Sequence, residues 1–166
     1  MIPSNVKATF NEVYANGSTT TPPHWAWVAG SSFRKIVSQQ GYCAVAGWCS
    51  PKNFFWGYTE ATNYPPEDTP IMRAKWIPNT QSNPTIVYAW IPNNNATAWS
   101  WYQGWINGGA NIVGNFVDQE YYNNEWAYAL GYFSNYTQVR LSNDNDIATY
   151  KTAWDETWFC SSDICP

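Results

Sequence analysis

The stretch TIVYAWIPNNNATAWSWYQGWINGGANIVGNFVDQEYYNNEWAYALGYFSNYTQVRLSND, from Thr85 to Asp144, decides the fold of this chain. It alternates short runs of aromatic and β-branched residues with clusters of Asn, Gly and Pro. Aromatic and β-branched side chains favour the pleated, half-buried surface of a strand, whereas Asn, Gly and Pro supply turns. The stretch therefore predicts a series of short strands joined by tight turns.

The same pattern continues on both sides of this stretch. Strand runs recur about every 8–12 residues, which is typical of a sandwich or jelly roll, and no ten-residue segment shows a helical apolar stripe. We therefore expect an all-β protein, an antiparallel β-sandwich of jelly-roll type. The expected strands are residues 71–77, 86–91, 98–102, 111–117, 125–133, 137–141 and 147–154, with weaker ones in 7–14 and 25–37.

Alternation predicts which strand residues form the core. Residues 86–91 are apolar on both faces, which predicts a strand buried on both sides. The residues that we expect to be substantially buried are Trp76, Tyr88, Trp90, Trp126, Val139 and Leu141.

The chain length of 166 residues predicts one domain, with residues 1–23 as a polar N-terminal arm and 24–166 as the sandwich. The chain contains twelve Trp and twelve Tyr, more than one small core can hide. Because exposed aromatic rings bury much area at low entropic cost, the surplus predicts a recognition surface.

Charge excludes several classes of partner. Charged residues make up 12% of the chain and the net charge is −4, so nucleic acid is not expected and acidic partners are disfavoured. No apolar run approaches the roughly 20 residues that a membrane-spanning helix needs. The start MIPSNVKATF has neither the basic beginning nor the apolar centre of a signal peptide, so we interpret Met1 as the start of a mature or partial chain.

The four cysteines predict two disulfides in an oxidising compartment. Three pairings are open, and short turn-rich loops favour Cys43 with Cys49 and Cys160 with Cys165. Zinc is the alternative, but the spacings are longer than in zinc knuckles and the chain has only one histidine, His24.

Three N-glycosylation sequons agree with an extracellular glycoprotein. They begin at Asn16, Asn95 and Asn135.

Several short motifs occur in order between residues 74 and 144: AKWIP (74–78), VYAWIP (87–92), NGG (107–109), VDQ (117–119), EWAYALGYF (125–133) and VRLSND (139–144). Together they resemble the golvesin-like domain, a bacterial extracellular β-sandwich module. The resemblance covers about residues 72–154 and implies a galactose-binding-domain-like sandwich with a non-catalytic role in binding glycans or the cell envelope. Both cysteine pairs and the ending TAWDETWFC depart from the family pattern.

No pattern of catalytic residues emerges, so we do not expect an enzyme. His24 has no nucleophile motif around it. A glycosidase needs two carboxylates, but the acids most open to that interpretation lie in turn-like contexts: Asp118, Glu120, Glu125, Asp155 and Glu156. No cofactor is expected. The run Asn143–Asp146 is read as a polar turn, with structural calcium as an alternative, because calcium prefers carboxylate and amide oxygens.

Turn-borne aromatics are the predicted binding site. A sugar stacks its C–H face on an aromatic ring while amides bind its hydroxyls. The candidate residues are Trp105, Tyr121, Tyr122, Asn107, Asn123 and Asn124, with Phe54, Phe55 and Trp56 as a second cluster. Trp99 and Trp101 share a face that is either core or a flat platform.

Two functions from different classes follow from these observations. The first is a secreted module that binds a glycan or cell-envelope polysaccharide. The second is a structural subunit that self-associates into filaments or matrix by pairing of aromatic strands.

Overall fold

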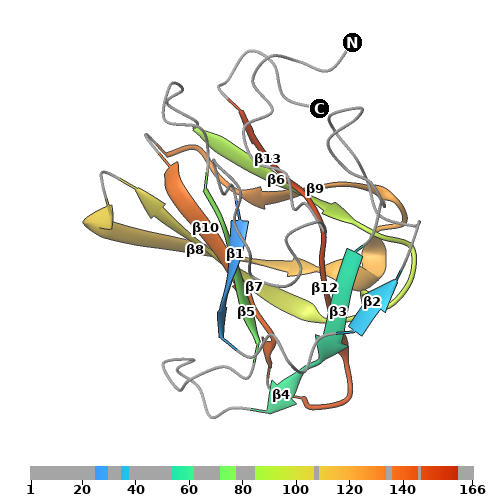
Figure 1. The fold of residues 1–166 in the computed structure, drawn as a ribbon. Helices are drawn as coiled ribbons and strands as arrows, with labels where there is room; N and C mark the ends of the chain where they lie inside the picture. The colour runs from blue at the N-terminus through green and yellow to red at the C-terminus, as the bar shows by residue number, and fades with distance from the viewer. Residues whose placement is uncertain are drawn as a thin grey trace.

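The computed structural model describes residues 25–29, 35–37, 54–61, 72–77, 85–106, 109–133, 136–145 and 147–160. Strand dominates these residues, and no α-helix occurs among them (Figure 1). The strands are β1 (Trp25–Ala29), β2 (Lys35–Val37), β3 (Phe54–Tyr58), β4 (Glu60–Ala61), β5 (Arg73–Trp76), β6 (Ile86–Ile91), β7 (Trp99–Ile106), β8 (Asn111–Asp118), β9 (Glu125–Leu130), β10 (Tyr136–Ser142), β11 (Asp144–Asn145), β12 (Lys151–Trp154) and β13 (Thr157–Cys160). A 3₁₀ turn, η4 (Gln119–Tyr121), follows β8.

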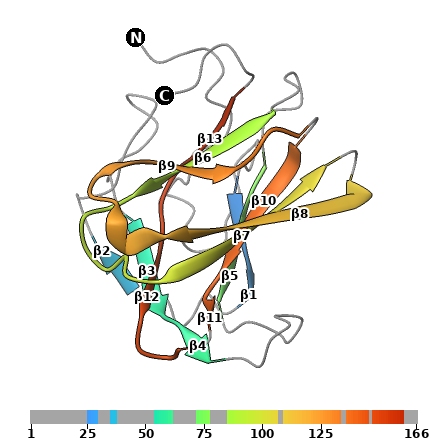
Figure 2. The same ribbon diagram turned by 180° about the vertical axis from the view of Figure 1, so that it is seen from behind.

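The strands form antiparallel sheets, which confirms the expected antiparallel β-sandwich. The largest sheet has the order β1-β5-β10-β7-β8, and two three-stranded sheets have the orders β13-β6-β9 and β12-β3-β2. One short parallel pair joins β11 to β4. Figures 1 and 2 both place β6, β9 and β13 at the top of the molecule and β4 at the bottom. The jelly-roll connectivity stays a prediction.

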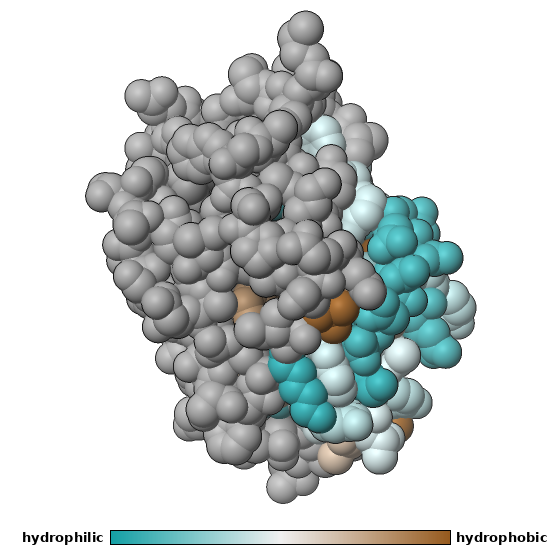
Figure 3. Space-filling view, turned by 45° about the vertical axis from the view of Figure 1, so that its right-hand side comes forward, coloured by the Kyte–Doolittle hydropathy of each residue, from teal (hydrophilic) through white to brown (hydrophobic). Residues whose placement is uncertain are grey.

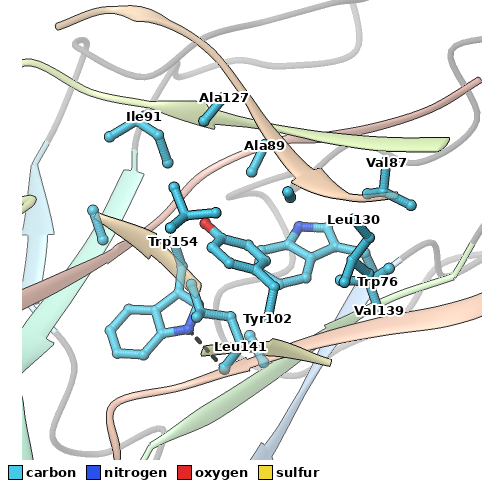
Figure 4. Packing of buried hydrophobic residues seen from close by; sticks show 14 of the residues in the cluster. Trp76, Val87, Ala89, Ile91, Tyr102, Ala127, Leu130, Val139, Leu141 and Trp154 are labelled. Atoms are coloured by element: carbon cyan, nitrogen blue, oxygen red, sulfur yellow. Dashed lines mark hydrogen bonds between the residues drawn. The ribbon is translucent and has the colours of Figure 1, made fainter. Parts of the chain in front are cut away.

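The core lies between the sheets, and strand alternation decides which residues enter it. In β7, Ser100, Tyr102, Gly104 and Ile106 are buried, whereas the residues between them face outward. Figure 4 shows Tyr102 among side chains from β5, β6, β9 and β10. Burial raises the pKa of Tyr102, so its hydroxyl stays protonated at neutral pH.

Buried indole N–H groups in the core find carbonyl partners. The Nε1 of Trp76 donates to the carbonyl of Asp155 at 3.0 Å, and the Nε1 of Trp154 donates to the carbonyl of Leu141 at 3.0 Å (Figure 4). An unpaired polar group in this position would cost about 1–3 kcal/mol. The two bonds therefore allow bulky tryptophans to fill the core.

One glutamine ties η4 to β12. The Gln119 side chain is fully buried, its Oε1 accepts from the backbone N–H of Ala153 at 2.9 Å, and its Nε2 donates to the Ala153 carbonyl at 3.1 Å. The same Nε2 lies 3.2 Å from the Tyr102 hydroxyl. The amide thus replaces a missing strand neighbour and fixes the end of the β7–β8 hairpin against the core.

Asn143 and Asp144, expected in a polar turn, instead form a buried polar corner together with Ser142. Asn143 accepts from the Met72 N–H at 2.8 Å and donates to the Tyr58 carbonyl at 3.0 Å. Ser142 donates to the Asp144 carboxylate at 2.9 Å. The turn expectation is wrong for these residues, because they are buried and Asn143 bonds the backbone of Tyr58 in β3 and of Met72 just before β5. Among the described residues, no cluster of three metal-binding side chains occurs.

The expected core is confirmed at Trp76, Val139 and Leu141, which are at most 1% exposed. Three other expected residues are of intermediate burial and do not belong to the central core: Tyr88, Trp90 and Trp126.

These three aromatics lie on the outer face of the β13-β6-β9 sheet. The Trp90 and Trp126 rings pack edge to face with centroids 5.5 Å apart, and the Trp126 and Trp158 rings do the same. Small residues at 127 and 129 of β9 face the core instead. Apolar residues on both faces of β6 therefore signalled ring pairing across strands rather than burial on both sides.

Several expectations lie outside the described residues. They are the arm at 1–23, the strand at 7–14, residues Asn107, Cys43, Cys49 and Cys165, and the sequons at Asn16 and Asn135. The side chain of Cys160 is also outside the described part, although its backbone ends β13.

Trp76→Ala should unfold the protein much more readily than Trp90→Ala. Removing a fully buried aromatic side chain costs about 3–5 kcal/mol, and this variant also leaves the Asp155 carbonyl without its indole donor. Trp90 is half-buried on an outer face, so its loss should cost clearly less. Urea denaturation of both variants measures the difference, and equal losses would contradict the assigned faces.

Candidate functional site

The outward residues of β7 form a row of aromatic rings. Trp99, Trp101 and Trp105 alternate with the buried residues of the strand, and Gln103 lies between the second and the third tryptophan. Antiparallel pairing with β8 sets Phe116 opposite Trp101 and Ile112 opposite Trp105. The row therefore widens across two strands. We call Trp99, Trp101, Trp105 and Phe116 the aromatic face.

The rings at one end of the aromatic face pack against one another. The Trp99 and Phe116 rings are stacked, with centroids 4.6 Å apart and planes inclined by 29°. The Trp101 and Phe116 centroids are 4.5 Å apart. Trp99 is nevertheless 55% exposed and Phe116 39% exposed. The rings thus support one another while leaving surface open to solvent.

A glycine on β8 makes room for one of these rings. Gly114 pairs with Gln103, and a Cβ added there would lie 2.1 Å from Cζ2 and 2.5 Å from Cη2 of Trp101. Any other residue would force the indole away, because atoms do not approach so closely. The indole of Trp101 therefore lies directly over the β8 backbone.

The other end of the aromatic face carries a positive charge. The Arg140 guanidinium lies over the Trp105 ring, 4.3 Å from its centroid, in cation–π geometry. In the register, Gln138 is opposite Trp105 and Arg140 is opposite Gln103. On the far side of β10, Lys75 of β5 pairs with Arg140. Amide and basic groups therefore border the rings.

Two guanidinium groups near this end have perturbed acidity. Burial lowers the pKa of Arg140, and the neighbouring Arg73 guanidinium lowers it further. Burial also lowers the pKa of Arg73, although the Asp144 carboxylate opposes that shift. Arginine remains protonated at neutral pH in spite of such shifts. Two like charges are thus held close enough to repel.

The structure separates the residues predicted to form the binding site. Trp105 lies within strand β7, not at a turn, and pairs with Ile112. Tyr121 ends η4, beyond the opposite end of the hairpin, where Trp99 pairs with Asp118. Six residues of strand separate Trp99 from Trp105, which is about 20 Å. Trp105 and Tyr121 therefore do not form one site.

The remaining predicted residues occupy different environments. Tyr121 is 82% exposed, whereas Tyr122 packs against the hydrophobic core. Asn123 is exposed, and its N–H lies 3.4 Å from the Glu125 carboxylate. Figure 3, which turns the η4 side of the molecule forward, shows the described surface there as largely hydrophilic. Asn107 is outside the described residues.

The second predicted cluster is only partly at the surface. Phe54 and Phe55 are fully buried, so their assignment to a surface cluster is wrong. Trp56 is half-buried on the outer face of β3, where the ammonium groups of Lys35 and Lys151 lie 4.8 Å and 5.0 Å from its ring. The sequence did not reveal which of the three side chains is exposed, because three consecutive aromatic residues show no alternation between polar and apolar side chains.

The acidic residues considered for catalysis have structural roles or are buried. Asp118 caps η4 by accepting from the Glu120 N–H at 3.2 Å, and Glu125 accepts from Asn123. Asp155 and Glu156 are almost fully buried between β12 and β13.

Sequence reasoning left Trp99 and Trp101 undecided and missed Phe116 and Arg140. The sequence of β7 does carry one indication that the tryptophans face outward. The polar Gln103 lies on the same face as the three tryptophans, whereas Ser100 and Gly104 lie on the other face. Phe116 follows from pairing across the hairpin, which fixes it opposite Trp101. Arg140 comes from a strand more than thirty residues away, so no local pattern indicates it.

A scan against protein-family models and searches of curated proteins and of solved structures found no match to this chain. Within the described residues, no helix is long and apolar enough to cross a membrane.

The stacked pair at the end of the aromatic face should show measurable coupling. A double-mutant cycle with Trp99→Ala and Phe116→Ala should give an interaction of about 0.5–1.5 kcal/mol, because such ring pairs contribute beyond their buried area. The matched control is Trp99 with Ile112, which faces the same side near the other end of β8 and should give additive losses. Additive losses for the stacked pair would mean that the rings are not packed in solution.

Proposed function

We propose that this protein is a secreted, non-catalytic carbohydrate-binding module whose binding site is the aromatic face. The observation that carries the proposal is the row of outward rings on β7 and β8, held in place by ring packing and by Gly114. The proposed binding site therefore lies on strands β7 and β8, whereas the sequence predicted a site at the turns.

The geometry suits the stacking of an extended polysaccharide. Trp101 and Trp105 lie four residues apart on one strand, a separation of about 13 Å, so one chain would reach both rings. Gln103 lies between the two rings, and Gln138 lies opposite Trp105. Their amides both donate and accept hydrogen bonds, which matches the hydroxyls of a sugar ring stacked beside them.

Such a face should bind weakly but with little reorganisation. An open surface excludes less water than a deep pocket, so we expect dissociation constants between micromolar and millimolar, about −8 to −4 kcal/mol. The rings are fixed on paired strands, so binding orders few side chains. Repeated contact along a polymer would compensate for weak single sites.

Trp101→Ala combined with Trp105→Ala should abolish binding to immobilised polysaccharides while changing the melting temperature little, because both rings lie outside the core. The matched control is Tyr128→Ala, an exposed aromatic on the outer face of β9 in another sheet. Affinity electrophoresis against a panel of glycan and cell-wall polymers measures binding. Retained binding in the double variant, or equal loss in the control, would contradict the assigned site.

Gly114→Val tests the same site without removing a ring. The added side chain must displace the Trp101 indole, so binding should weaken several-fold. Because Gly114 is exposed and valine favours strands, the unfolding free energy should change by less than about 1 kcal/mol. A variant that binds like the unchanged protein would show that Trp101 does not contact the ligand.

Self-association is the second candidate function, and one observation favours it. In the described part of the chain, β8 pairs only with β7, and residues 111–117 of this edge strand carry no charge. Long uncharged edges are prone to pair with another chain. Sedimentation velocity over a range of concentrations decides between the candidates, since ordered polymers without any glycan binding would favour assembly.

The extracellular location and the golvesin-like resemblance also remain proposals. Because disulfides form and persist in an oxidising extracellular environment, non-reducing peptide mapping should find Cys43 joined to Cys49 and Cys160 to Cys165. Each short loop should contribute about 2–3 kcal/mol to stability in the chain-entropy model. Four free thiols would contradict the proposed compartment, and crossed pairs would contradict the local pairing.

A further inference from the structure

The described basic residues are unevenly distributed, and three of them border the β10 side of the aromatic face. Arg73 and Lys75 lie on β5, and Arg140 lies on the neighbouring strand β10. All three alternate with buried residues, so they share the outer face of the five-stranded sheet with Trp105. The positive charge thus gathers along the β10 side of the aromatic face, where Arg140 and Lys75 are level with Gln103.

The register places the charges in a row across the strands. Lys75 pairs with Arg140, and Arg140 pairs with Gln103. Neighbouring strands lie about 4.8 Å apart, so an ammonium, a guanidinium and an amide follow one another beside the Trp105 ring. This row combines charge-assisted and neutral hydrogen-bond donors in one line.

The Arg140 guanidinium is not neutralised within the described structure. Burial and the like charge of Arg73 both lower its pKa, and no described acidic group opposes them. Its Nε atom is buried without a hydrogen-bond partner. Asp144 attracts Arg73, which leaves Arg140 as the less compensated of the two. A partly buried positive charge in this state would gain from a nearby anion.

From these contacts we infer that the ligand of the aromatic face is an acidic polysaccharide. One of its sugar rings stacks near Trp105, and the anionic group on the same chain approaches Arg140 and Lys75. This inference rests on the proposed carbohydrate-binding function and specifies the substrate class. A carboxylate suits the planar guanidinium, and a sulfate ester offers the same charge.

The net charge of −4 does not oppose this ligand. Charges further away than about 8 Å are largely screened at physiological ionic strength. Asp118, a described acid on β8, pairs with Trp99 at the opposite end of the aromatic face. The local distribution of charge therefore favours an acidic ligand at this face, whereas the charge of the whole chain alone disfavours acidic partners.

The decisive experiment compares two polymers with the same sugar backbone. Polygalacturonate carries a carboxylate on each unit, and its fully methyl-esterified form is neutral. Calorimetry should show about tenfold or tighter binding to polygalacturonate. This preference should vanish as sodium chloride approaches about 1 M, where the Debye length falls to about 3 Å. Dextran sulfate and dextran form a second pair, which distinguishes sulfate from carboxylate as the source of the charge.

Substitutions of single basic residues show which side chains cause the preference for the charged polymer. In Arg140→Gln the ratio of the two affinities should fall towards one, and Lys75→Gln should reduce it less. Lys75→Gln also tests the inference if Arg140→Gln fails to fold. The matched control is Lys151→Gln, which removes a lysine beside Trp56 on another sheet and should leave the ratio unchanged.

The outcomes separate this inference from the function on which it rests. Equal binding to the charged and neutral polymers would overturn the acidic ligand while leaving carbohydrate binding intact. Binding to none of the four polymers would overturn both. Displacement of polygalacturonate by sodium sulfate, at the ionic strength of a sodium chloride control that does not displace it, would show that the anion binds without the sugar, which also overturns the inference.

Discussion

Strand β7 carries the constraint on which the rest of the molecule depends, because its alternation of side chains builds both the core and the outer face. The strand pairs with β10 on one side and β8 on the other. Its inward side packs Tyr102 into the centre of the sandwich, whereas its outward side presents three tryptophans. A shift of register by one residue would bury the tryptophans and expose Tyr102. The core therefore fixes the aromatic face indirectly, because the register that buries Tyr102 also turns the three tryptophans outward.

Buried polar side chains hold this register from outside the strand. Gln119 bonds both backbone groups of Ala153, and Asn143 bonds both Met72 and Tyr58. Each amide substitutes for a missing strand neighbour, so the hairpin and the polar corner are fixed without further strands. This arrangement explains how a chain so rich in tryptophan keeps several rings at the surface. A purely apolar core could pack in several arrangements. The buried amides and the hydrogen-bonded indoles reduce that number, because each needs its own backbone partner.

The fold class was predictable from the sequence, and the site was predictable only in part. Alternation identified β5 and its buried face, and Pro and Asn clusters marked the turns. The half-buried state of Trp90 and Trp126 was not predictable, because an aromatic ring satisfies a core and an outer-face ring pair equally well. Arg140 and Phe116 join the site through pairing between strands, which a single sequence does not display. Asn143 resembled a turn residue because local composition does not show which distant backbone groups it bonds.

The glycine at position 114 separates two kinds of evolutionary change in this protein. Most residues of the aromatic face project from an outer surface, so substitutions there would change the proposed binding surface at small cost to folding. Selection could thus explore new specificities while the sandwich stays intact. Gly114 is different, because only the absence of a side chain there lets the Trp101 ring lie where it does, against the β8 backbone. A single mutation at a residue that offers no side chain to a ligand can therefore reshape the surface, and drift at this position should be tolerated by the fold but not by the site.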